Sequence, residues 1–130
     1  MALKTKNQTG TTYKYVPVSE RDEKQPFTVT IRPLTSRELA VLEDKLLKIG
    51  KDETISFSSG SFNWEVCKKG IVDWDNVTDE KNKPLALKKG IDGLIEDETL
   101  NLLPLYMITE IAGVISSISK DPENAETFLK

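Results

Sequence analysis

Apolar and polar residues alternate in two different periods along this chain, and each period predicts a different element. From Phe27 to Arg32 they alternate one by one, which predicts a strand with one buried face. Aromatic and β-branched residues from Thr12 to Val18 predict a second extended segment, and Pro17 confines that segment to a sheet edge. The N-terminal part is therefore expected to form a small antiparallel sheet or hairpin.

A helix is predicted directly after this strand. Thr35 and Glu38 have the spacing of a capping box, in which each side chain binds a free amide at the helix start. Apolar residues then recur at spacings of three and four from Leu39 to Ile49, and Gly50 stands where a C-cap glycine belongs. The pattern thus predicts one helix that reaches Ile49.

The middle of the chain is expected to contain a short strand, a second helix and a polar loop. Residues 54–57 alternate and suggest the strand, while residues 62–72 have the spacing of a helix. The apolar stripe of that helix would consist of Trp64, Cys67, Ile71 and Trp74. Residues 73–83 are rich in turn formers, and residues 84–87 suggest a last short strand.

The C-terminal third is predicted to be helical. Pro104 suits the first position of a helix whose broad apolar face runs from Leu105 to Ile118. Another short helix is predicted after it, with Asp121 as its N-cap and Pro122 as its first residue. The long helix is expected to be the backbone of the core.

These elements fit one domain of the α+β class. A chain of 130 residues is long enough to bury one core and too short for two. We expect a small N-terminal antiparallel sheet or hairpin packed against a mainly helical C-terminal part. Residues 1–11 are polar and without period, so they are interpreted as a flexible tail, and residues 12–130 as the single domain.

Charge and hydropathy narrow the classes of partner. The formal net charge is −3, and the lysines and arginines are spread along the chain, so direct binding to nucleic acid is disfavoured. No apolar run approaches the length of a membrane span, and the first residues lack the apolar core of a signal peptide. The expected location is a cytoplasm.

The residues of common enzyme chemistry are scarce. The chain has no histidine and one cysteine, which excludes Ser–His and Cys–His nucleophile pairs and cysteine-based metal clusters. Cys67 lies in line with Trp64 and Ile71 on the predicted helix. That position favours a small buried apolar residue over a nucleophile activated by Lys68 or Lys69.

Acidic side chains gather at residues 73–80 and 96–98. Paired carboxylates can act as general acids and bases or hold a divalent cation, but solvated turns and helix starts are the favoured interpretation. The chain also lacks a glycine-rich phosphate loop. We therefore expect no enzyme activity, no catalytic residues, no metal and no cofactor.

Four residues are candidates for binding a protein partner: Trp74, Tyr106, Phe128 and Leu129. Tryptophan is enriched at interface hot spots, although a place in the core is the favoured alternative for Trp74. Phe128 and Leu129 stand near a chain end, where they either fold back on the core or offer an apolar handle to a partner.

Three segments resemble one known family. They are residues 27–38, from Phe27 to Glu38; residues 70–85, with Gly70-Ile-Val-Asp-Trp followed by an acidic turn and Pro84-Leu; and residues 121–128, Asp-Pro-Glu-Asn-Ala-Glu-Thr-Phe. In this order they resemble the small tail assembly chaperones of long-tailed bacteriophages. The chain departs from that family at Asn82, where a glycine often turns the acidic loop.

The resemblance implies a protein that acts in the cytoplasm of an infected bacterium. It would bind the long, hydrophobic tape measure protein and keep it soluble while the tail tube subunits assemble around it. It would self-associate as a helical adaptor, leave before the virion is complete, and in many cases exist in a short and a frameshifted long form. The family has no catalytic residues.

Two further functions stay open at this stage. One is a structural phage tail or neck protein, such as a connector or completion protein, that stays in the virion and forms rings. The other is an inhibitor of an enzyme, for which the sequence has no specific signal.

Overall fold

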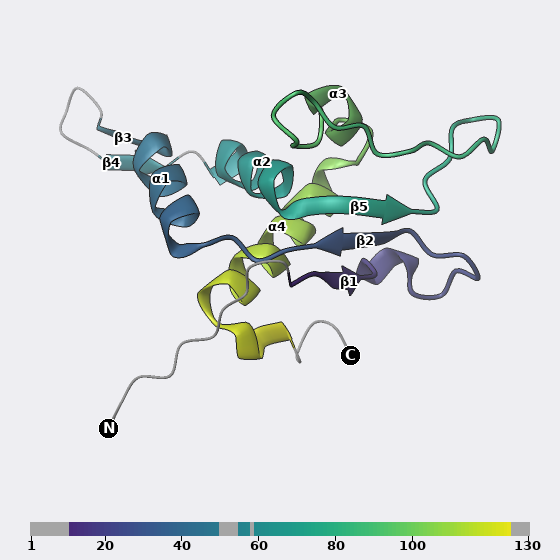
Figure 1. Ribbon diagram of the computed structural model, residues 1–130, viewed down its shortest axis with the longest axis horizontal. Helices are drawn as coiled ribbons and strands as arrows, with labels where there is room; N and C mark the ends of the chain where they lie inside the picture. Colours follow the sequence, from purple (N-terminus) through teal and green to yellow (C-terminus); the bar gives the residue numbers. More distant parts are fainter. Residues whose placement is uncertain (1–10, 50–54, 58, 126–130) are drawn as a thin grey trace.

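The computed structural model describes residues 11–49, 55–57 and 59–125, which form an α+β fold (Figure 1). The strands are β1 (Tyr13–Tyr15), β2 (Thr28–Ile31), β3 (Leu47–Ile49), β4 (Ile55–Phe57) and β5 (Ile71–Asp75). The helices are α1 (Ser36–Leu46), α2 (Ser59–Gly70), α3 (Asp97–Leu100) and α4 (Leu105–Lys120), with the short 3-10 helices η1 (Val18–Glu20) and η2 (Pro122–Asn124). The α+β class predicted from the sequence is confirmed. Of the expected tail, residues 1–11, all but Thr11 lie outside the described residues.

The main sheet is antiparallel and has the order β1-β2-β5. Val29 and Ile31 in the central strand are fully buried on its inner face. On the outer face Lys14, Thr30 and Asp73 lie side by side across the three strands. The alternation read from the sequence is confirmed, and β1 lies at an edge, as Pro17 predicts.

The start of α1 is built as its capping box predicts. The amide of Glu38 donates to Thr35 Oγ1 at 3.1 Å, and the amide of Thr35 donates to Glu38 Oε1 at 3.0 Å. The helix is shorter than predicted, because it ends at Leu46 and the chain continues as β3. β3 pairs with β4 in a second, two-stranded sheet, and this pairing replaces the last helical turn.

The second predicted helix also ends early, and this changes the place of Trp74. α2 stops at Gly70, so Ile71 and Trp74 belong to β5 and not to a helical stripe with Trp64. A Cβ on Gly70 would lie 2.7 Å from Ile115 Cδ1 in α4, so any larger residue at this position would force the Ile115 side chain to shift. The Gly70 carbonyl then accepts the amide of Arg32 at 2.8 Å and begins the pairing with β2.

Helix α4 is the centre of the core, as predicted. It crosses the main sheet and also packs against α2 (Figure 1). Its buried residues are Met107, Ile108, Ile111, Ala112, Val114, Ile115 and Ile118. These residues span most of its length, so α4 contributes to the core from its first turn to its last.

The loop between β5 and α3 contains no regular strand within the described residues. The strand predicted over residues 84–87 is absent, and isolated bridges join Thr78 to Pro84 and Lys89 to Ile95. Proline has no amide to donate to a ladder, which limits strand pairing here. Asn82 turns the loop with φ of 61°, a left-handed conformation that glycine adopts freely and asparagine tolerates.

Candidate functional site

Helix α4 has a buried side and an open side, and the open side carries no charge along most of its length. We define the open face as Leu105, Tyr106, Thr109, Gly113 and Ser116. Leu105 is 74% exposed and Tyr106 is 58% exposed. An exposed helix face is normally covered by charged and polar side chains. Large apolar residues without neighbouring charges are instead typical of a surface that binds another protein.

The one charged residue between Thr99 and Ser119 is Glu110, and it is bound elsewhere. Its Oε2 accepts the Tyr15 hydroxyl at 2.5 Å and the Val18 amide at 3.0 Å. Burial, followed by the hydrogen bond to the Glu110 carboxylate and its negative charge, raises the pKa of Tyr15 to about 12. Glu110 therefore ties β1 and η1 to α4, and its carboxylate is directed toward those elements.

A groove lies beside the junction between α3 and α4, and Leu102 extends the apolar surface into it. The groove has a volume of about 580 Å³, and Val77, Leu85 and Leu102 form its apolar lining. Leu102 is 54% exposed. Asp79 Oδ1 accepts the amides of Lys81 at 2.8 Å and Lys83 at 3.0 Å. Asp79 thus organises the turn that forms the charged rim of the groove.

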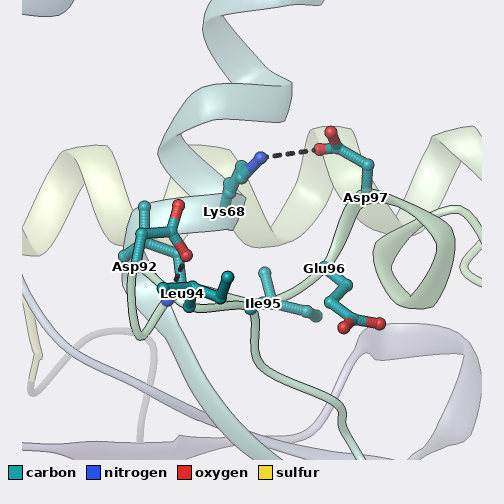
Figure 2. A pocket seen from close by; sticks show the side chains of 8 residues that line it. Lys68, Asp92, Leu94, Ile95, Glu96 and Asp97 are labelled. Atoms are coloured by element: carbon teal, nitrogen blue, oxygen red, sulfur yellow. Dashed lines mark hydrogen bonds and ion pairs between the residues drawn. The ribbon is translucent and has the colours of Figure 1, made fainter.

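A second depression lies beside the start of α3, and two of its charged residues, Lys68 and Asp97, bind each other. It has a volume of about 470 Å³ and lies between α2 and the loop at residues 90–97. Figure 2 shows Lys68 and Asp97 pointing toward each other, with Nζ and Oδ1 3.0 Å apart. The Trp64 indole donates to the same oxygen at 3.0 Å. Lys68, followed by Trp64, lowers the pKa of Asp97, so this cluster joins α2 to α3.

The structure places Trp74 in the core and corrects its candidate role in partner binding. Its side chain is 5% exposed and meets Phe27 edge-to-face, with ring centroids 6.1 Å apart. Its Nε1 donates to the Leu85 carbonyl at 2.9 Å. The ring fastens the polar loop to the sheet and is not presented to a partner, which agrees with the favoured core alternative.

Of the other three candidates, the structure describes the position of one. Tyr106 lies on the open face. Phe128 and Leu129 lie outside the described residues. The prediction that Leu105 belongs to the core face of the long helix is wrong, because Leu105 is exposed as the first residue of α4. The sequence analysis does not single out Leu102 either. The run from Thr99 to Ser119 with one charge, in a chain with 30% charged residues, is a signal that points to both.

Cys67 is a structural residue. It is fully buried, its Sγ donates to the Ile108 carbonyl of α4 at 3.3 Å, and burial raises its pKa to about 12. A thiol in this state is a poor nucleophile.

Within the described parts of the chain, no group of three or more histidine, cysteine or acidic residues is placed to hold a metal ion. Among the described helices, none has the length and apolar character needed to cross a membrane.

Comparisons of the chain with models of known protein families, with curated proteins and with solved structures found no match. What the chain binds is therefore inferred from its own surface and from the resemblance of its three segments.

Proposed function

We propose that this chain is a phage tail assembly chaperone that binds the tape measure protein in the host cytoplasm and keeps it soluble during tail assembly. The observation that carries the proposal is the open face of α4, where Leu105 and Tyr106 stand exposed beside Thr109 and Gly113 with no charge among them. The identity of the proposed partner comes from the resemblance to that family, which residues 27–38, 70–85 and 121–128 carry.

The chemistry of the open face fits an apolar helical partner. A helix of a hydrophobic protein could lie along α4 and bury Leu105 and Tyr106, with Leu102 extending the contact toward the groove at the junction of α3 and α4. Burying one large apolar side chain contributes on the order of 1.5–3 kcal/mol before the costs of association. Three such side chains support a modest affinity, which suits a chaperone that must leave its partner when the tail tube forms.

The proposal predicts which proteins accompany the chain in infected cells. When the tagged chain is co-expressed with the tape measure protein and the tail tube subunits, we expect it to recover the tape measure protein in soluble form. We also expect mass spectrometry of purified particles to lack the chain. A chain that stays in the particles would be a structural connector or completion protein, and the chaperone proposal would then be wrong.

A further inference from the structure

We draw no further inference here: the strongest candidate, the groove that Val77, Leu85 and Leu102 line beside the junction of α3 and α4, adjoins the open face already described, and nothing in the described residues shows what covers it.

Discussion

Trp74 is buried and makes two specific contacts, one through its ring and one through its indole nitrogen. Its ring is buried, it meets Phe27 edge-to-face, and its Nε1 binds the Leu85 carbonyl. Removing a buried aromatic ring leaves a cavity, and here it also leaves a carbonyl without its donor. The single residue thus joins β5 to Phe27, which directly precedes β2, and to the polar loop.

We therefore expect Trp74→Ala to lower the free energy of unfolding by roughly 3 to 5 kcal/mol. Urea denaturation followed by circular dichroism measures this loss. Trp74→Phe, which keeps an aromatic ring but not the indole donor, should lose less. An unfolding curve for Trp74→Ala that matches the parent would mean that the ring is not part of the core.

Glu38 makes the stability of the fold sensitive to acid. Arg32 Nη2 lies 2.8 Å from its Oε2, and the side-chain hydrogen bonds from Arg32 hold the pKa of Glu38 at about 2, below the ordinary 4.5. A carboxylate with a lowered pKa stabilises the fold above its unfolded-state pKa. That contribution is lost as the pH falls through the folded-state pKa.

We expect the melting temperature to fall between about pH 4.5 and pH 2, and to fall less steeply there in a Glu38→Gln variant. The exposed Glu43 on the same helix provides the control, because Glu43→Gln removes a carboxylate that has no such partner among the described contacts. Identical pH profiles for the parent and Glu38→Gln would show that the ion pair with Arg32 does not stabilise the fold.

At the scale of elements, the sequence predicts the start of α1 better than its end, and it misplaces both ends of α2, which is predicted over residues 62–72 and observed over Ser59–Gly70. The capping box of Thr35 and Glu38 is local chemistry, and it forms as predicted. The ends of α1 and α2 depend on partners distant in sequence: β3 pairs with β4, and Gly70 meets both Ile115 and Arg32. Helical spacing continues past both ends, so periodicity alone cannot locate them.

Gly70 provides a test of this packing. A methyl group at this position would lie against Ile115 in α4, so we expect Gly70→Ala to lower the free energy of unfolding by about 1–3 kcal/mol despite the better helix propensity of alanine. Thermal or urea unfolding measures the change. Gly113→Ala is the matched control, because nothing surrounds that glycine in the single chain, and it should stabilise the monomer. A stabilising effect of Gly70→Ala would refute the close contact.

At the scale of the whole molecule, α4 packs one side into the core and leaves Leu105 and Tyr106 exposed on the other. The sequence predicts the buried side from its apolar period and also identifies Tyr106. It does not separate core from surface among the leucines at the start of α4, because Leu103 is buried while Leu102 and Leu105 are exposed. That distinction depends on the turn between α3 and α4, which is set by tertiary packing and not by residue type.

The most direct measurement compares tape measure binding by two matched surface variants. The double variant Leu105→Ser and Tyr106→Ser changes the open face, while Val41→Ser changes a residue on α1 that is 50% exposed. We expect the first to weaken capture of the co-expressed tape measure protein by about tenfold or more, with a melting temperature close to that of the parent, and the second to bind normally. Undiminished capture by the double variant would show that the open face of α4 is not the binding surface.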